Sequence, residues 1–480
     1  MSDTQRYQLT QDHRELVESW GMNRRTVSYV FRPTTAEQIA DVFTLAKSTG
    51  RTIALRGAGC SYGDASLNAE QIVLDLSRMN RILEWDPDSG VITVEPGATI
   101  RNLWLYIIED GWWPPVVSGT SFVTLGGALG MNIHGKNNFK AGPIGDHVLA
   151  FDILLPTGKV KHCSRDENGE LFHAAIGGFG MLGIFTRITL QMKRVYSGLL
   201  RVNAFSTTGF AEINAALEEH RAQSDYMVGW IDAFSTGKSF ANALVHTANY
   251  LAPGEDLNPA QTLRVVNQEI SPTIMGIVPR SLLGKLLQPF NTNPGMRLIN
   301  LAKSIQASVT ESGHTILQPH AQFAFLLDYV PDWKFAYKPG GLIQFQSFVP
   351  FDQSERVFTR QIELSQKLGI IPFLGVYKRH KPDDFLMTHA VDGHSFALDY
   401  PYTDQNKAGL SFLVQQMARL VVDAGGRFYY AKDSLLPADL ARAGMGEERI
   451  ARFAAIKSEC DPERILRSDL SRRIYDGFAG

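Results

Sequence analysis

Along residues 26–195 the hydrophobic residues recur with a period of about 2 in some segments and about 3.6 in others. This pattern predicts a chain in which strands and helices alternate. Short apolar or alternating runs predict strands at 26–31, 52–59, 72–79 and 184–192, and hairpins at 82–97 and 147–163, with DSG and TGK at the turns. Residues 32–50 and 99–111 have a helical period. In the first of these helices Thr34 and Glu37 stand at capping-box spacing, and Gly50 is placed to end it.

The pattern changes after residue 196. Strand-like runs at 226–234, 342–351 and 371–380 alternate with a helix at 354–369, which indicates a second domain of α+β type. The stretch 252–320 is irregular and rich in proline, and the chain becomes helical again from about residue 407. The fold class that we expect is therefore α+β.

Composition and charge exclude several classes of protein. Hydrophobic residues make up 44% and charged residues 20% of the 480 residues, and the formal net charge is −2, so nothing suggests a nucleic-acid partner. Cys60, Cys163 and Cys460 are scattered, which favours a reducing compartment over a disulfide framework. The sequence shows no signal peptide and no apolar run long enough to span a bilayer, so we expect a cytoplasmic protein.

Residues 125–148 are rich in glycine and include His134 and Lys136. The stretch is not a P-loop, because Asn137 follows the Gly-Lys pair where a magnesium ligand is needed. Glycines allow backbone N–H groups to approach an anionic ligand closely. A tight structural turn is the alternative, but the SGTS segment at 118–121 favours a ligand site.

Other short motifs exclude familiar sites. Gly178, Gly180 and Gly183 match GxGxxG, but a helical segment precedes them and a strand follows, which reverses the order of a Rossmann site. The histidines form no HExxH motif or Cys/His cluster, so we expect no metal site, and no GxSxG motif supports a serine hydrolase.

Three cationic features each have a structural and a functional interpretation. His134 is either a structural histidine or a tuned group at a ligand site. Lys432, in YYAKDS, is either a surface lysine or a cation that stabilises negative charge in an active site. Residues 271–310 form either a partly buried loop or a flap that contacts anionic lipid, because they mix apolar residues with cations and contain no Asp or Glu. Those cations are Arg280, Lys285, Arg297 and Lys303.

Four separated motifs now stand in one order: RGAGCSYGD at 56–64, the segment 118–137, GGFGMLGI at 177–184 and AKDS at 431–434. Together they resemble the vanillyl-alcohol-oxidase-type (PCMH-type) FAD flavoproteins, and among these the oxidases of polyprenyl-phosphoryl ribose. The resemblance covers nearly the whole chain and includes SWG at 19–21, QFQ at 344–346 and LDYP at 398–401.

This resemblance implies a bipartite FAD-binding domain with a substrate (cap) domain built on an antiparallel sheet. The expected division is 1–195 for the FAD-binding domain, 196–406 for the substrate domain and 407–480 for a segment that returns to the first. It implies that His134 and Lys432 lie beside the flavin as catalytic residues, and that the substrate pocket contains Lys136, Gln344, Gln346 and Lys378. The implied FAD contacts are Arg56, Gly57, Ala58, Gly59, Cys60, Ser61, Tyr62, Gly119, Thr120, Thr124, Gly126, Gly127, Asn132, Ile184 and Tyr429.

The chain departs from the family pattern at three positions. Cys60 stands where many relatives attach FAD through a histidine, so we expect non-covalent FAD. Ala397 replaces a pocket cysteine, and an aromatic pocket residue is replaced near Ala324, so the sugar or lipid can differ from that of the relatives.

The activity that the resemblance implies is hydride transfer from a secondary hydroxyl carbon of a sugar to FAD. The expected substrate is the 2′-hydroxyl of a polyprenyl-phosphoryl ribose or a similar lipid-linked sugar, on the route to an arabinosyl lipid donor of the cell envelope. A short-chain reductase partner and contact with the inner face of the membrane through 271–310 are further expectations. The alternatives are a soluble alditol or sugar-lactone oxidase, a flavin-dependent reductase of a lipid double bond, and a flavin-free binding subunit.

Overall fold

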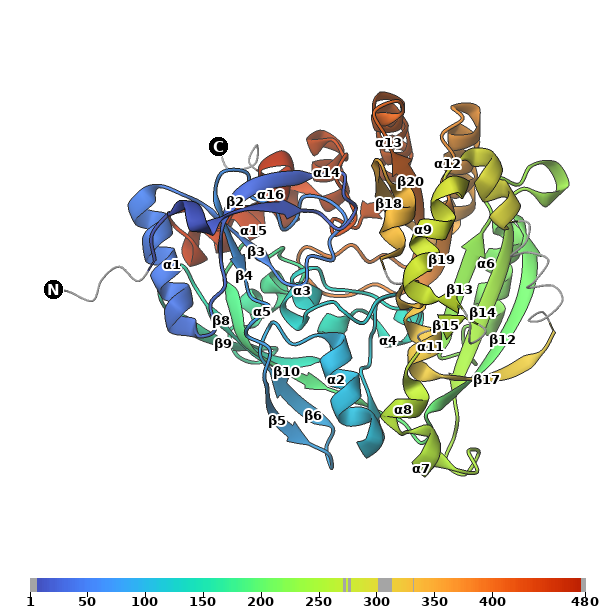
Figure 1. The fold of residues 1–480 in the computed structure, drawn as a ribbon, viewed down its shortest axis with the longest axis horizontal. Helices are drawn as coiled ribbons and strands as arrows, with labels where there is room; N and C mark the ends of the chain where they lie inside the picture. Colours follow the sequence, from blue (N-terminus) through green and yellow to red (C-terminus); the bar gives the residue numbers. More distant parts are fainter. Residues whose placement is uncertain (1–6, 271–272, 275–277, 301–312, 331, 476–480) are drawn as a thin grey trace.

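The computed structural model of the protein describes residues 7–270, 273–274, 278–300, 313–330 and 332–475. Its helices and antiparallel sheets confirm the α+β class. The N-terminal elements lie on one side, an eight-stranded sheet lies on the other, and the last helices return to the N-terminal side (Figure 1).

Two sheets form the N-terminal side. A four-stranded sheet has the order β1-β2-β4-β3, with β2, β4 and β3 parallel, and a five-stranded antiparallel sheet has the order β5-β6-β10-β8-β9. The predicted strands and hairpins are confirmed within a few residues, whereas β1 was not predicted. The bounds of these strands are β1 Arg14–Glu18, β2 Arg25–Phe31, β3 Ile53–Arg56, β4 Ile72–Asp75, β5 Ile82–Asp86, β6 Val91–Val94, β8 Val148–Leu154, β9 Val160–Ser164 and β10 Ile184–Gln191.

The cap of the first predicted helix lies one residue later in the sequence than expected. Thr35, rather than Thr34, caps α1 (Ala36–Thr49) by accepting a hydrogen bond from the backbone amide of Gln38. The side chain of Gln38 reaches back to the backbone amide of Thr34, which a glutamine can do as well as a glutamate. Gly50 ends the helix at φ +61°, as predicted. The other helices of this side are α2 Ile100–Ile107, α3 Leu125–Gly130, α4 Asn138–Ala141 and α5 Gly169–Ala175.

The second half of the chain builds an eight-stranded antiparallel sheet with the order β17-β12-β14-β13-β19-β20-β18-β21. Helices α6 (Gly209–His220), α12 (Phe351–Lys367) and α13 (Lys407–Asp423) pack against it. The strands are β12 Leu199–Thr208, β13 Tyr226–Ile231, β14 Asn242–Tyr250, β17 Thr315–Pro319, β18 Gly341–Pro350, β19 Leu374–His380, β20 Gly393–Tyr402 and β21 Arg427–Phe428.

The C-terminal segment contacts the first sheet. The backbone amides of Ile53 and Arg467 bond to the carbonyls of Ile465 and Ile53, and Arg473 forms ion pairs with Asp64 and Asp433. Helices α14 (Ala438–Met445), α15 (Glu447–Cys460) and α16 (Asp469–Ile474) thus lie beside the N-terminal elements (Figure 1). Since α13 packs on α12, the division at residue 407 remains a proposal.

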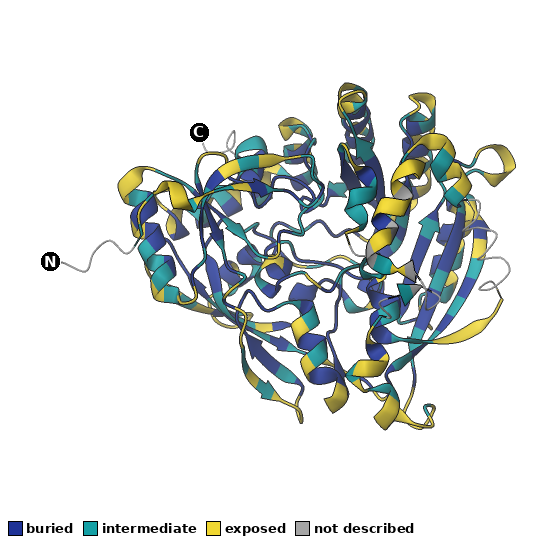
Figure 2. Ribbon diagram, in the orientation of Figure 1, coloured by how far each residue is buried: buried dark blue, intermediate teal, exposed yellow. Residues whose placement is uncertain are grey.

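One cluster of buried apolar side chains runs from β6 and α2 into the eight-stranded sheet, so the two sides share a core. Exposed positions are concentrated on the outer faces of the helices and at sheet edges (Figure 2). Continuous packing of this kind holds the facing surfaces of the two sides in a fixed relation.

Candidate active site

A cavity of about 1290 Å³ lies between the glycine-rich loops of the N-terminal side and one face of the eight-stranded sheet. Pockets for one small ligand are usually about 300–1,000 Å³. The cavity is therefore large enough for a cofactor together with a second ligand.

The first glycine loop follows β3 and forms one wall of the cavity. The guanidinium of Arg56 donates to the carbonyl of Glu18 and to the hydroxyl of Ser66 and lies against Gly59. A Cβ atom at Gly59 would lie 2.3 Å from Nη2 of Arg56, and the residue has φ +69°. Both the space and the backbone conformation therefore require glycine here.

The second glycine loop touches the first. A Cβ atom at Gly57 would lie 2.0 Å from Oγ1 of Thr124, which precedes α3, and one at Gly126 would lie 2.8 Å from Cβ of Pro96. Gly57 approaches the side chain of Thr124 closely because it has no Cβ of its own, and both loops line the cavity. Residues 57–62 and 118–127 together form the cradle, and their binding of a cofactor stays a prediction.

The opposite wall consists of alternate residues of four adjacent strands. Antiparallel pairing places Gln344 opposite Asp399 and Gln346 opposite Ala397, and β19 adds Lys378 on the same side. Because side chains alternate across a strand, the QFQ segment sends both glutamines into the cavity and buries Phe345 behind them. The residues of these four strands that line the cavity are Tyr226, Val228, Gly229, Trp230, Leu374, Val376, Lys378, Gln344, Gln346, Ala397 and Asp399.

His134 lies at the junction of the two walls. The amide nitrogen of Gln346 donates to its Nε2 at 3.0 Å, and the ring is packed among those of Phe348, His380, His389 and Tyr429. Burial, reinforced by the charge of Lys378, holds the pKa of His134 well below its usual value. The ring is neutral at pH 7, and with Nε2 accepting from the amide its proton is on Nδ1.

Two lysines face the cavity, Lys136 and Lys378, and neither forms an ion pair within the described ranges of the chain. Nζ of Lys136 donates to the carbonyl of Phe323 and lies 4.2 Å from the centre of the Phe323 ring. Burial lowers the pKa of Lys136 to about 7 and that of Lys378 to about 8, and the charge of Lys378 also lowers the pKa of Lys136. An anionic ligand would stabilise both ammonium groups.

Lys432 and Asp399 share the inner end of the cavity. Nζ of Lys432 lies 3.6 Å from the centre of the Tyr62 ring, in the first glycine loop. Burial lowers the pKa of Lys432 to about 7 and raises that of Asp399 to about 7, while their opposite charges partly offset both effects. The side-chain amide of Gln344 donates to the carboxylate of Asp399.

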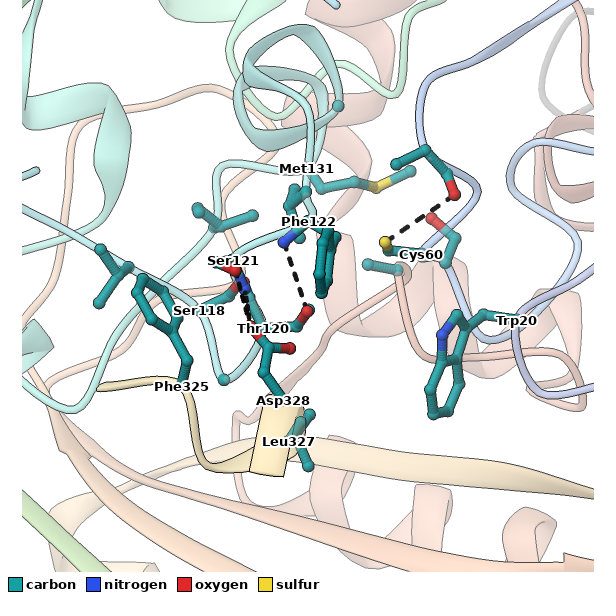
Figure 3. Close-up of a pocket in the computed structure, with 18 of the residues that line it drawn as sticks. Trp20, Cys60, Ser118, Thr120, Ser121, Phe122, Met131, Phe325, Leu327 and Asp328 are labelled. Carbon is teal, nitrogen blue, oxygen red and sulfur yellow. Dashed lines mark hydrogen bonds between the residues drawn. The ribbon is translucent and has the colours of Figure 1, made fainter. Parts of the chain in front are cut away.

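The 3-10 turn Leu326–Tyr329, which precedes the last strands of the eight-stranded sheet, contacts the second glycine loop (Figure 3). Asp328, on the 3-10 turn Leu326–Tyr329, accepts hydrogen bonds from the backbone amide of Ser121 at 2.8 Å and from its hydroxyl at 2.7 Å. The amide of Leu327 donates to the carbonyl of Gly119. These bonds attach the second glycine loop, which belongs to the N-terminal side, to a segment from the second half of the chain.

Most of the residues implicated by the sequence line this cavity. Asn132 and Ile184 are among the buried residues but not among those that line it: Asn132 accepts from the amide of Gly145, and Ile184 begins β10 in the second core cluster. Asp328 and Asp399 were not selected from the sequence as site residues. The signal for Asp399 was a lone carboxylate in a strand of apolar residues. The lining residues that were implicated are Arg56, Gly57, Ala58, Gly59, Cys60, Ser61, Tyr62, Gly119, Thr120, Thr124, Gly126, Gly127, His134, Lys136, Gln344, Gln346, Lys378, Tyr429 and Lys432.

The basic and apolar stretch at 271–310 lies partly outside the described residues, as does its Lys303. In the described part, Arg280 donates to the carbonyl of Tyr329 and lies 4.6 Å from its ring, whereas Lys285 and Arg297 are exposed. Leu286 and Leu298 also face solvent. Within the described ranges no helix is long and apolar enough to cross a membrane, and no group of three or more His, Cys, Asp or Glu side chains is placed to hold a metal ion.

Comparison with known proteins agrees with this geometry. Residues 27–164 match the model of the FAD binding domain family. The chain is 29% identical over 463 residues to decaprenylphosphoryl-β-D-ribose oxidase of Mycolicibacterium smegmatis, which covers 95% of this chain and 96% of the relative. L-gulonolactone oxidase of Bos taurus is 29% identical over 196 residues, 41% of this chain and 43% of that enzyme. These matches confirm the expected resemblance: the chain is an FAD-dependent oxidoreductase with a PCMH-type FAD-binding domain.

The residues present fit FAD. The glycine cradle offers backbone that a Cβ would obstruct at Gly57 and Gly59, and Arg56 supplies positive charge behind it. The cavity continues from this cradle to Lys432 and His134, so a long cofactor bound in the cradle reaches both.

Proposed function

We propose that this oxidoreductase converts a secondary hydroxyl of a lipid-linked sugar, such as the 2′-hydroxyl of a polyprenyl-phosphoryl ribose, to a ketone. Lys136 and Lys378 carry the proposal, because these two cations face the cavity opposite the FAD cradle and form no ion pair within the described part of the chain. A free polyol or sugar lactone has no negative charge to pair with these lysines. A sugar joined to a lipid through a phosphate has one.

FAD, when bound, accepts the hydride. Around it we assign Lys432 to stabilise the negative charge that accompanies flavin reduction, since a preorganised cation in a buried site is effective there. His134 is assigned to orient the reacting hydroxyl, because Gln346 fixes its ring. From the sequence, either His134 or Lys432 can also accept the hydroxyl proton.

The sheet wall suits a sugar and its phosphate. Gln344 is oriented by Asp399, which as a carboxylate accepts from the amide nitrogen and leaves Oε1 of Gln344 to accept from a sugar hydroxyl. We assign Gln344 and Gln346 to the sugar, and Lys136 and Lys378 to the phosphate. Ala324 and Ala397 keep this part of the cavity wide.

The remainder of the cavity is apolar enough for the first part of a lipid chain, through Val228, Val376, Ala321 and Phe325. We further propose that the exposed part of 271–310 makes peripheral contact with a membrane that holds the substrate, because Leu286 and Leu298 stand beside Lys285 and Arg297. A short-chain reductase that reduces the ketone is the partner that this chemistry needs for an epimerisation. Non-covalent FAD is proposed because Cys60 replaces the attaching histidine.

The test is anaerobic mixing of the purified protein with a panel of alcohols. Polyprenyl-phosphoryl ribose should bleach the flavin absorbance within seconds, whereas alditols and sugar lactones at the same concentration should not. Bleaching by the free polyols alone would replace this proposal with a soluble sugar oxidase. A flavin that no alcohol bleaches would favour reduction of a lipid double bond instead.

A further inference from the structure

Asp399 is the most buried carboxylate among the described residues that line the cavity. Its exposed fraction is 0%, although it faces Lys432 across the inner end. The other carboxylates of the lining are engaged or exposed: Asp328 binds Ser121, Glu269 pairs with Arg101, and Asp332 faces solvent. Asp399 therefore holds the one negative charge of the described lining that is removed from water.

The two oxygens of Asp399 have different surroundings. Oδ1 accepts from the amide of Gln344, whereas Oδ2 has no hydrogen-bond partner among the described residues. An unpaired carboxylate oxygen in a buried site is unfavourable, because it has lost its hydrogen bonds to water without gaining a partner in the protein. A ligand hydroxyl that donates to Oδ2 would remove that cost, so the free oxygen indicates a ligand group in the space between Asp399, Gln344 and Lys432.

We propose that Oδ2 of Asp399 receives the proton of the substrate hydroxyl, a role that rests on the alcohol oxidation proposed above. The O–H bond breaks and its proton passes to Oδ2. The C–H bond breaks and its hydrogen leaves with both electrons as hydride to FAD, and the carbon–oxygen double bond forms. Asp399 ends neutral and protonated, so no atom or charge is left unassigned.

The other two proton acceptors are less suited to this step. Nε2 of His134 already accepts from Gln346, and burial disfavours the imidazolium form. Lys432 accepts a proton only after it has lost one, which removes the cation that reduction of the flavin requires. With Asp399 as acceptor, Lys432 remains charged throughout.

Proton transfer also changes the partner of Lys432. Before the step, the ammonium group faces the negative charge of Asp399. After it, Asp399 is neutral and the whole charge of Lys432 is available to the reduced cofactor. The charged and titratable groups that face Asp399 are Lys432, after β21, together with Tyr62, in the first glycine loop, and Tyr337, in the 3-10 turn Trp333–Tyr337, whose pKa values its charge raises.

The experiment compares Asp399→Asn with Asp332→Asn, which changes an exposed carboxylate at the edge of the same cavity. The substrate is whichever alcohol of the panel above bleaches the wild-type flavin. Asp399→Asn should retain FAD and slow flavin reduction by about 10²–10⁴-fold, the usual contribution of a general base. Asp332→Asn should reduce its flavin at the wild-type rate.

Three further measurements separate a catalytic from a structural effect. The wild-type reduction rate should pass through a maximum near pH 7, because Asp399 must be ionised and Lys432 must be charged, and the rise on the acid side should be absent in Asp399→Asn. Infrared difference spectra of alcohol-reduced minus oxidised protein should show the C=O band of a protonated carboxyl, which Asp399→Asn lacks. In Asp399→Ala, added formate should restore part of the rate.

The outcomes are distinguishable. If polyprenyl-phosphoryl ribose fails but another alcohol bleaches the flavin, the proposed substrate is wrong and Asp399 is still tested with that alcohol. If Asp399→Asn reduces its flavin as fast as the wild type, or the carboxyl band persists in it, the role of Asp399 is overturned. If no alcohol reduces the wild-type flavin, both proposals are overturned.

Discussion

Asp328 joins the 3-10 turn Leu326–Tyr329 to the second glycine loop by accepting two hydrogen bonds from Ser121, one from the backbone amide and one from the hydroxyl (Figure 3). The two residues are far apart in the sequence and come from opposite walls of the cavity. Because the carboxylate bonds to the loop rather than to a side chain alone, it fixes the path of the backbone that forms the FAD cradle.

Removing this carboxylate should therefore loosen the cradle. Asp328→Asn should lower the free energy of unfolding by about 1–3 kcal/mol, since a hydrogen bond to a charged group is lost, and should raise the rate at which FAD dissociates. Urea unfolding and flavin fluorescence on dilution measure the two effects. Ser121→Ala removes only the hydroxyl bond and should have a smaller effect. The variant that carries both changes completes the comparison. If all three variants lose the same free energy of unfolding, the hydroxyl bond accounts for the whole interaction.

Lys432→Met should separate cofactor binding from cofactor reduction. Its ammonium group contacts the ring of Tyr62, at the end of the first glycine loop, and not the glycine backbone at Gly57 and Gly59, so the variant should still purify with FAD. Flavin reduction should slow by about 10²–10³-fold, as on loss of one preorganised group that stabilises developing charge. The reduction potential should also fall. Lys334→Met, which removes a lysine near Trp20, is the control and should change neither quantity. An unchanged potential in Lys432→Met would contradict the assignment.

The hydrophobic pattern was sufficient for most of the N-terminal side. Strands such as 26–31 and 72–79 carry period-2 or continuous apolar runs, and their ends agree with the structure to within a few residues. The pattern did not predict β12, β14 or β17. In β12 and β14, polar residues such as Asn203 and Thr247 interrupt the alternation of apolar side chains, although neither residue lines the cavity.

Only the part of the site that depends on local sequence could be predicted. Bare backbone leaves a signal in sequence, so the segments around Gly57 and Gly126 stood out. Asp328 and Asp399 became candidates only when pairing placed one on Ser121 and the other opposite Gln344. Such contacts join residues more than fifty positions apart, and no local period encodes them.

Gly57→Ala tests the close contact between the two loops. The added methyl group would lie 2.0 Å from Oγ1 of Thr124, so one loop must move and FAD binding should weaken by at least tenfold. Gly50→Ala is a matched control: its Cβ meets nothing within 4 Å, and its positive φ costs only about 1 kcal/mol of stability. Thr124→Ala in the Gly57→Ala background should restore part of the affinity by removing Oγ1. Isothermal titration of the apoprotein with FAD measures each. Unchanged affinity in Gly57→Ala would show that the loops tolerate separation.

Buried histidines should make the protein sensitive to mild acid. Burial lowers the pKa of each of six histidines below the unfolded value of about 6.5, to about 4 for His320 and about 3 for His389. The others are His134, His147, His380 and His394.

The sign of the effect follows from which state binds the protons. Between pH 6.5 and the lowered values, the unfolded chain binds protons that the folded chain does not, so the free energy of unfolding decreases as pH falls. Each histidine contributes up to about 1.4 kcal/mol per pH unit. Urea midpoints should fall steeply from pH 6.5 to 5, below the range in which Lys136, Lys378 and Lys432 change charge in the folded protein. His389→Phe, which stays in contact with the rings of Phe348 and Tyr429, should reduce that slope by the contribution of one proton. A midpoint that rises on acidification would show that these histidines are protonated in the folded protein.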